Sequence, residues 1–248
     1  MVIDGEEATS VLVTPVWKDA RRLAGFAPEL ARALATVPGD VRWVIADDGS
    51  GNEELEALEV IRQGVRGIFP QVSIHAAERH RGKGGVIREA WAAFPQARWL
   101  GFVDADGSVS AADVVSLLGM AERTGRSVIG VRVKTDETEV REGLWRGLRH
   151  RGFLAISRLL LALETEDTQC GVKVLAGDDF RRVEPNLREE GFAFDVELLA
   201  ELHSAGLSWQ EVPVNWVEKD HSRLAPGEWW RMLKALIRIQ RRLMNREV

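Results

Sequence analysis

Cysteine is almost absent from this sequence of 248 residues, and long apolar runs are absent altogether. The one cysteine, Cys170, excludes a disulfide framework and a metal site built from several cysteines. A chain without disulfides is typical of the reducing cytosol. No stretch reaches the roughly 18 apolar residues of a membrane-spanning helix. Residues 1–7 also lack the basic and apolar regions of a signal peptide, so we expect a cytoplasmic protein.

Negative charge is in modest excess, and it is unevenly distributed. Hydrophobic residues make up 45% and charged residues 29%, which excludes a disordered or fibrous chain. The formal net charge is −5, but residues 221–248 alone carry +5, which leaves −10 for the first 220 residues. An acidic body argues against general nucleic-acid binding. The basic end suits a local anion or an anionic membrane surface.

Apolar runs of strand length alternate with helical patterns in the first half of the chain. We expect strands at residues 11–14, 41–46, 72–74, 99–103 and 127–133, with helices in the segments between them. Such alternation with short connections predicts an α/β fold with a mostly parallel sheet and helices on both faces. The second half is less regular. We expect one domain over residues 1–225, followed by a C-terminal segment at 226–248.

The C-terminal segment predicts a basic amphipathic helix. Its apolar residues recur at helical spacing from Trp229 to Met244 and are interleaved with Lys and Arg residues. A basic helix with tryptophans is typical of a membrane interface. The alternative is that its apolar side packs on the domain and its charges are solvated. The pattern leaves both interpretations open.

Two aspartates follow the strand expected at residues 99–103. In an open α/β sheet, ligands bind beyond the carboxyl ends of the strands. Asp104 and Asp106 are two residues apart, so in an extended chain their carboxylates point to the same side. Converging carboxylates favour a hard cation such as Mg²⁺ or Mn²⁺. The alternative is a solvated turn between a strand and a helix.

A second acidic segment ends the strand expected at residues 41–46. Asp47 directly follows residue 46, and we expect it to face the crevice and to accept hydrogen bonds from a base or a ribose. Asp48 or Ser50 is a candidate for the cap of the helix that follows.

The segment Arg79–Gly85 is basic and rich in glycine. Glycines at a helix start let backbone N–H groups approach an anion, and Lys83 adds a mobile charge. The segment matches neither a Walker A loop nor the dinucleotide-binding G-x-G-x-x-G pattern. A flexible basic turn is the alternative.

A basic cluster precedes the apolar stretch that ends at Leu163. It contains Arg141, Arg146, Arg149, His150 and Arg151. Such runs are usually solvated faces, but this one adjoins the polar segment Asp167–Lys173, which is unusual for a strand. Within that segment, Cys170 is interpreted as small and buried rather than nucleophilic.

Six segments together resemble family-2 glycosyltransferases with the GT-A nucleotide-sugar-binding fold. The resemblance is greatest to the branch of dolichyl-phosphate β-glucosyltransferases and polyprenyl-phosphate sugar synthases, and it covers about residues 10–240. The segments are Val44–Ser50, Arg81–Gly85, Asp104–Gly107, Asp167–Lys173, Gly191–Leu199 and Glu211–Trp216. The Gln-x-x-Arg-Trp signature of processive synthases is absent, so we expect transfer of a single sugar.

The resemblance implies a donor site. Asp104 and Asp106 correspond to the metal-binding DxD pair, and Asp47 to the residue that contacts the base. The donor-binding residues implied are Pro15, Trp17, Asp47, Lys83, Asp104 and Arg223. The family usually has Pro-x-Tyr where this chain has Pro15-Val16-Trp17, so Trp17 would replace the aromatic residue near the base.

The resemblance also implies an acceptor side lined by Asp167, Gln169, Asp195 and Glu197. An alcohol acceptor needs a general base, for which Asp195 and Asp167 are the candidates. A lipid phosphate is already ionised, and the arginine cluster (Arg141, Arg146, Arg149 and Arg151) suits its phosphate.

The expected function is therefore a metal-dependent, inverting transfer of one hexose from a nucleotide-diphospho-sugar, UDP-glucose being the expected donor, to a polyprenyl phosphate. The enzyme would use Mg²⁺ or Mn²⁺ and would bind no nucleic acid. It would be cytoplasmic and peripheral on the inner face of the membrane. Two alternatives keep the donor site: a soluble alcohol acceptor, or a non-catalytic nucleotide-sugar-binding protein. A sugar-nucleotide pyrophosphorylase would carry a glycine-rich loop after the first strand, which this sequence lacks there.

Overall fold

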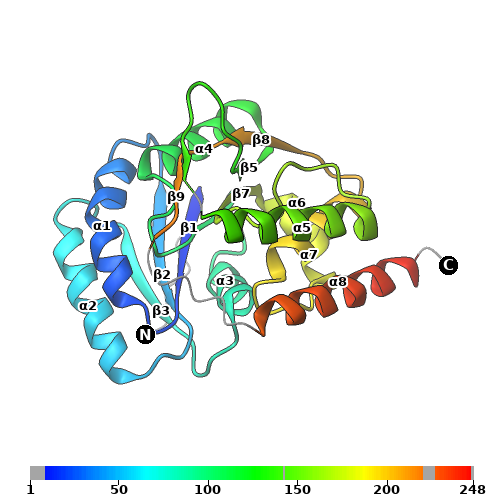
Figure 1. Cartoon of the computed structure of the whole chain (residues 1–248). Coiled ribbons are helices and arrows are strands. Elements are labelled where there is room, and N and C mark those ends of the chain that lie inside the picture. Colours follow the sequence, from blue (N-terminus) through cyan, green and yellow to red (C-terminus); the bar gives the residue numbers. More distant parts are fainter. Residues whose placement is uncertain (1–8, 142, 220–226, 247–248) are drawn as a thin grey trace.

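A seven-stranded sheet forms the centre of the molecule (Figure 1). The computed structural model describes residues 9–141, 143–219 and 227–246. The strand order is β3-β2-β1-β4-β7-β5-β8. The strands are β1 (Ser10–Val16), β2 (Val41–Asp47), β3 (Val72–Ala76), β4 (Trp99–Val103), β5 (Ser127–Val131), β7 (Val172–Ala176) and β8 (Trp209–Pro213).

The mostly parallel sheet predicted from the sequence is confirmed. Strands β1, β2, β3 and β4 pair in parallel, as do β5 and β8. Strand β7 is inserted between β4 and β5 and runs antiparallel to both. The five strands expected in the first half are all present, and their ends differ from the predicted ones by at most two residues.

Helices cover both faces of the sheet. Helices α1 (Ala20–Leu34), α2 (Asn52–Arg66) and α4 (Ala111–Thr124) pack on one face. The other face carries α3 (Lys83–Ala92), α5 (Leu144–Leu161), α6 (Gly177–Val183), α7 (Phe194–Ser204) and α8 (Glu228–Met244). Neighbouring residues of a strand enter opposite cores, since side chains alternate across the sheet: Leu12 packs with α1, and Val11 and Val13 pack with α3.

Three short elements complete the fold. Strands β6 (Val140–Arg141) and β9 (Trp216–Val217) form a separate two-stranded parallel sheet. A 3₁₀ turn, Glu184–Asn186, follows α6.

The C-terminal helix packs on the rest of the molecule. Four side chains of α8 are buried, those of Met232, Ala235, Leu236 and Ile239. The helix contacts α5 and α7. The alternative in which the apolar side of this segment packs on the domain is therefore correct for these four buried residues. Among the described residues, we find no helix both long enough and apolar enough to cross a membrane.

Candidate functional site

Four charged side chains alternate in sign at the carboxyl edge of the sheet. Lys83 Nζ lies 2.9 Å from Asp104 Oδ1 and 2.9 Å from Asp195 Oδ2. On its other side, Asp195 Oδ1 lies 2.7 Å from Lys173 Nζ. The sequence of contacts therefore runs from Lys173, which is wholly buried, to Asp104, whose side chain is 39% exposed. It connects the interior to the open end of β4.

The members of this cluster stabilise each other's charged forms. Burial would raise the pKa of Asp195, but Lys173 and Lys83 outweigh it and hold that pKa below its ordinary value. Burial also opposes the charge on Lys83, yet Asp104 and Asp195 hold its pKa above the ordinary value. Lys83 and Asp195 are therefore both charged at neutral pH.

A glycine contact sets the position of Lys83. Helix α3 begins at Lys83, and α7 begins at Phe194, next to Asp195. A Cβ atom on Gly84 would lie 2.3 Å from Cβ of Phe194. Only glycine therefore lets the two helix starts approach closely enough for Lys83 to reach Asp195.

Asp106 lies on the other side of the open end of β4. Its Oδ1 accepts a hydrogen bond from Ser108 N at 2.9 Å, and its Oδ2 lies 3.7 Å from Arg22 Nη1. Beside it is an open pocket of about 510 Å³, which is also lined by Arg22, Phe26 and Lys219. The predicted DxD pair thus borders a hollow on one side and Lys83 on the other.

The DxD pair suits a divalent cation that shares its coordination with a ligand. Burial, together with the carboxylates of Asp106 and Asp195, raises the pKa of Asp104 despite the nearby Lys83. A cation would relieve that repulsion. Among the described residues, no group of three or more His, Cys, Asp or Glu side chains converges. Two carboxylates alone fit Mg²⁺, which typically completes its shell with waters and substrate phosphates.

Asp47 has an unused acceptor in a buried position. The residue is fully buried at the end of β2, and its Oδ2 accepts a hydrogen bond from Ser50 N at 3.1 Å. Its Oδ1 has no hydrogen-bond partner among the described residues. Pro15 lies in the neighbouring strand β1, in register with Ala46. A buried acceptor without a donor is costly, and a bound N–H group would remove that cost.

An aromatic pair lies near the same strand ends. Trp17 is 42% exposed, and its ring stacks on His80 with the centroids 4.3 Å apart. His80 Nδ1 in turn lies 2.8 Å from Asp48 Oδ2. Asp48 thereby connects the aromatic pair to the end of β2.

Asp48 holds the glycine-rich segment. Backbone N–H groups of Arg81 and Gly82 donate to its carboxylate at 2.6 and 2.8 Å. The sequence suggested that N–H groups of this segment approach a bound anion. At Arg81 and Gly82 the anion is the carboxylate of Asp48. The suggestion that Asp48 or Ser50 caps the next helix is wrong, because α2 begins after Gly51 without a side-chain cap. Ser50 Oγ instead accepts a hydrogen bond from Lys18 N.

Asp167 lies in a separate buried ion pair. Arg132 Nε and Nη2 donate to its two oxygens at 2.6 and 2.8 Å, and His150 Nε2 lies 3.1 Å from Oδ1. The N–H of Gln169 donates to the same carboxylate at 2.8 Å. Burial opposes the charge of Asp167, but Arg132 and His150 hold its pKa well below the ordinary value. Asp167 therefore orders the chain around the end of β5.

Glu197 and Gln169 both contact the C-terminal helix region. Glu197 is fully buried, accepts hydrogen bonds from the N–H groups of Arg188 and Glu189, and pairs with Arg242 of α8. Gln169 Nε2 lies 3.9 Å from Sδ of Met232. Glu197 thus pairs with α8, whereas Asp195, two residues earlier on α7, pairs with Lys83. The two predicted acceptor residues are thus not brought together with the DxD pair by a direct contact.

The predicted arginine cluster is only partly described. Arg141 is exposed, and its Nε pairs with Glu139. Arg151 is exposed on α5. The side chains of Arg146 and Arg149, and the whole of Arg223, lie outside the described residues.

Two basic residues gain roles that the sequence pattern did not assign. Arg132 follows β5 and holds Asp167, and Lys173 lies within β7 and holds Asp195. Of the two, only Lys173 could have been noticed in the sequence, because a lysine inside an apolar strand needs a buried carboxylate as partner. Its partner, however, is 22 residues away in the chain.

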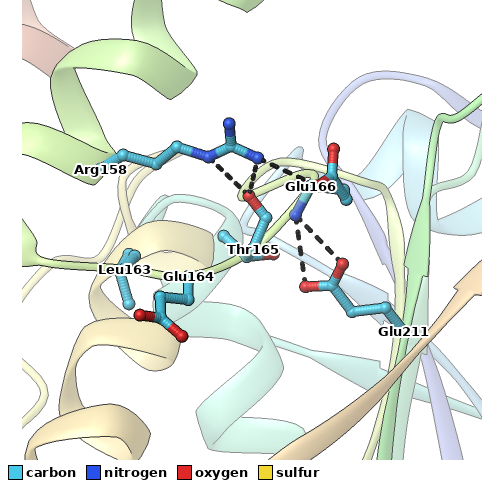
Figure 2. Close-up of a pocket in the computed structure, with 6 residues that line it drawn as sticks. All are labelled: Arg158, Leu163, Glu164, Thr165, Glu166 and Glu211. Atoms are coloured by element: carbon cyan, nitrogen blue, oxygen red, sulfur yellow. Dashed lines mark hydrogen bonds and ion pairs between the residues drawn. The ribbon is translucent and has the colours of Figure 1, made fainter.

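A second hollow, of about 380 Å³, lies near the end of α5 (Figure 2). Three glutamates line it: Glu164, Glu166 and Glu211. Arg158 donates to the Thr165 carbonyl, and the N–H of Glu166 donates to Glu211. None of the residues predicted to bind donor or acceptor lines this hollow.

The fold matches a solved glycosyltransferase-fold structure over nearly the whole chain. Glucosyl-3-phosphoglycerate synthase from Mycobacterium tuberculosis, crystallised with Mn²⁺, uridine diphosphate and glucosyl-3-phosphoglycerate, superposes with a TM-score of 0.62. The sequence identity is 17%, and the match covers 94% of this chain and 78% of that chain. The architecture is therefore the GT-A fold of glycosyltransferases, as predicted.

The sequence comparisons give the family. The model "Glycosyl transferase family 2" matches residues 23–175, and the chain belongs to that family. It is similar to the dolichyl-phosphate β-glucosyltransferase of Saccharomyces cerevisiae, at 27% identity over 90% of this chain and 71% of that protein. The Drosophila melanogaster enzyme of the same name is 32% identical over 88% of this chain and 70% of its own length. The predicted family is confirmed, and the protein is a glycosyltransferase.

Proposed function

We propose that this glycosyltransferase moves one hexose from a nucleotide-diphospho-sugar to a polyprenyl phosphate, with UDP-glucose as the donor. The observation that carries the proposal is the pair of carboxylates on Asp104 and Asp106, beside Lys83 at the open end of β4. The relatives named dolichyl-phosphate β-glucosyltransferase support the acceptor class and the sugar.

The donor's base is proposed to lie near the end of β2. The unpartnered Oδ1 of Asp47 would accept an N–H of the base. Trp17, already stacked on His80, and Pro15 at the end of the neighbouring strand would border the same ring. This placement removes the cost of a buried acceptor without a donor.

The donor's diphosphate is proposed to lie at the open end of β4. Asp104 and Asp106 would hold Mg²⁺ or Mn²⁺, whose charge offsets the negative charge that grows on the departing nucleoside diphosphate. Lys83 adds a positive charge beside Asp104, and Asp195 holds it in place. Arg223 is the further proposed donor contact. The acceptor oxygen attacks the anomeric carbon from the face opposite the diphosphate, so the configuration inverts.

A phosphate acceptor agrees with the ion pairs made by the two candidate general bases, Asp195 and Asp167. Asp195 is paired with two lysines, and Asp167 is paired with Arg132 and His150. Such contacts weaken a carboxylate as a base, because its pKa falls. A lipid phosphate is ionised before it binds and needs no base. The residues proposed to bind it are Arg141, Arg146, Arg149, Arg151 and Gln169, whereas Glu197, which is buried and paired with Arg242, would support this side of the site from behind.

A lipid-linked acceptor places the reaction at a membrane surface. We therefore propose that the protein is peripheral on the inner face of the membrane and contacts it through α8. The basic residues of this helix support that location.

The experiment uses Mg²⁺ or Mn²⁺, a panel of UDP- and GDP-sugars and short polyprenyl phosphates, with mass spectrometry of the lipid products. We expect a glycosyl phospholipid from UDP-glucose that is lost in Asp106→Asn. The matched control is Asp178→Asn, because Asp178 is a surface carboxylate, 96% exposed and paired with Arg181.

The other outcomes separate the alternatives. Nucleotide release without glycolipid would favour an alcohol acceptor, for which Asp195 or Asp167 would serve as general base. Donor binding without any turnover, across all acceptors, would overturn the proposal in favour of a nucleotide-sugar-binding protein.

A further inference from the structure

Helices α5 and α8 lie side by side (Figure 1) and expose an unusual share of apolar surface. Ten large apolar side chains are exposed among the described residues, and five of them lie on these two helices. They are Leu148, Leu159, Trp230, Ile237 and Met244. Leu159 is 83% exposed and Trp230 is 64% exposed. Apolar residues exposed one by one are common on protein surfaces, but a contiguous exposed patch marks a protein or membrane interaction site.

The exposed apolar residues of α8 lie along its edge toward α5. Trp230, Ile237 and Met244 are spaced by two helical turns and therefore form one row. On that side the helix meets α5 through Trp229, whose ring packs against Phe153 at 6.0 Å between centroids. Steps of four residues lead from Trp229 through the half-buried Leu233 to Ile237.

The exposed apolar residues of α5 lie along its edge toward α8. Leu148, Ala155 and Leu159 are exposed, and Gly152 belongs to the same row. A Cβ atom on Gly152 would lie 3.8 Å from the ring of Trp229. The two apolar rows therefore border one seam between the helices. We call this seam and its flanking charges the α5/α8 surface.

Positive charge surrounds the seam. The two helices contain nine Lys or Arg residues and one acidic residue, whereas the rest of the chain carries a formal net charge of −13. Among the described side chains of these two helices, the exposed basic ones are Arg151, Arg158, Arg231, Lys234, Arg238 and Arg241. Arg238 pairs with Glu189 on the flank away from α5, and for Lys234, Arg241 and Arg151 we find no carboxylate within ion-pair distance on the described part of the chain. The surface is apolar along its middle and basic on its flanks.

We propose that the α5/α8 surface docks flat on a bilayer that contains anionic lipids. Tryptophan, leucine and methionine side chains would enter the headgroup boundary, and the basic flanks would meet the lipid phosphates. A second copy of this chain is a poorer partner, because two strongly basic surfaces would face each other. A nucleic acid would meet the basic flanks but would leave the apolar seam uncovered.

Docking in this orientation would place the bilayer beside the acceptor side of the site. His150 of α5 contacts Asp167 at 3.1 Å, and Met232 of α8 contacts Gln169 at 3.9 Å. The inference deepens the proposed function, on which it rests for the lipid nature of the acceptor. It differs from contact through α8 alone because α5 contributes Leu148 and Leu159 to the surface.

The test measures co-sedimentation of the full chain with vesicles of phosphatidylcholine, with and without phosphatidylglycerol, in the absence of donor. We expect binding to the anionic vesicles that weakens at high salt. Leu159→Glu on α5 and Trp230→Glu on α8 should each lower the partition coefficient at least about tenfold. Val60→Glu is the matched control, since Val60 is 70% exposed on α2, a helix of the opposite layer, and should bind like the wild type.

Circular dichroism of each variant confirms that it is folded. An unchanged partition of Leu159→Glu would overturn the two-helix surface, and failure of the wild type to bind anionic vesicles would overturn docking altogether. A dimer or an RNA complex that Trp230→Glu abolishes, without vesicle binding, would assign the surface to that partner instead. Because no donor is present, the assay is independent of turnover. Vesicle binding by a protein that forms no glycolipid would contradict only the proposed function.

Discussion

Lys83 and Lys173 share the carboxylate of Asp195. Lys83 Nζ lies 2.9 Å from Oδ2, and Lys173 Nζ lies 2.7 Å from Oδ1. Lys173 also donates to the carbonyl of Cys170 at 2.9 Å. One carboxylate therefore holds two ammonium groups, one wholly buried and one directed at the DxD pair.

Replacement of that carboxylate should be costly for folding. We expect Asp195→Asn to lower the free energy of unfolding by about 3–5 kcal/mol, because Lys173 would keep its charge without a buried partner. Urea unfolding at neutral pH measures the change. Lys173→Met should cost less, because Asp195 keeps Lys83. Equal stability of Asp195→Asn and the wild type would mean that the cluster does not support the fold.

The ion pair of Asp167 predicts a pH dependence of stability. Asp167→Asn should lower the free energy of unfolding by about 3–5 kcal/mol near pH 7, because the buried guanidinium of Arg132 would lose the carboxylate to which Nε and Nη2 donate. The pKa of Asp167 is lower in the folded protein than in the unfolded chain, so the carboxylate stabilises the fold above about pH 4. That contribution is lost as the pH falls toward the depressed folded pKa.

The difference between wild type and Asp167→Asn should therefore be present near pH 7 and should shrink below about pH 4. Urea titrations across this range measure it. A difference that grows at acid pH would contradict the assignment of Asp167 as the ionised partner of Arg132.

Gly171 leaves room for the carboxylate of Asp104, which we propose to bind the metal. A Cβ atom at this position would lie 2.3 Å from Asp104 Oδ2. Gly171→Ala should therefore displace Asp104 and lower kcat/KM at least about tenfold, with a weaker response to added Mg²⁺ or Mn²⁺. Nucleotide release under metal titration measures both effects.

Gly191→Ala is the control for this substitution. A Cβ atom on Gly191 meets nothing within 4 Å, so its activity should match the wild type. If Gly171→Ala keeps full activity and the same response to added metal, the position of Asp104 seen here is not required for activity.

Cys170 should be inert in the folded protein. The residue is fully buried, and burial raises the pKa of its thiol to about 12. We expect almost no reaction with a thiol reagent at pH 8 in the native state and one reactive thiol per chain after denaturation. Fast native labelling would show that the region around β7 opens readily, and it would contradict the buried assignment.

The sequence predicted much of the first half of the fold because each strand and helix there is encoded locally. The run Trp99–Val103 has a strand length and an apolar character of its own, and Asp104 follows it directly. Asp104 must then lie at the edge of the sheet where ligands bind, because the carboxyl ends of parallel strands meet at that edge. The antiparallel strand β7 could not be predicted in this way, since its place between β4 and β5 depends on pairing with residues more than 40 positions away.

Side-chain partners were predicted less well than element positions. Glu197 was expected to line the acceptor side, and its ion pair with Arg242 of α8 could not be predicted from the sequence. Asp48 was expected at a helix cap, yet it holds the backbone of Arg81 and Gly82. Any exposed N–H or guanidinium nearby can satisfy a carboxylate, so its partner depends on which segments the fold brings close.

The sequence by itself determined the alternation of strands and helices, the location of Asp104 and Asp106 at a strand end, and the basic amphipathic character of α8. These features depend on residue spacing along one element. Only the tertiary structure decided that Lys173 and Lys83 share Asp195, that Arg132 holds Asp167, and that the exposed apolar rows of α5 and α8 meet. Those contacts join residues from separate elements, and their energies come from burial and charge pairing that exist only once the chain has packed.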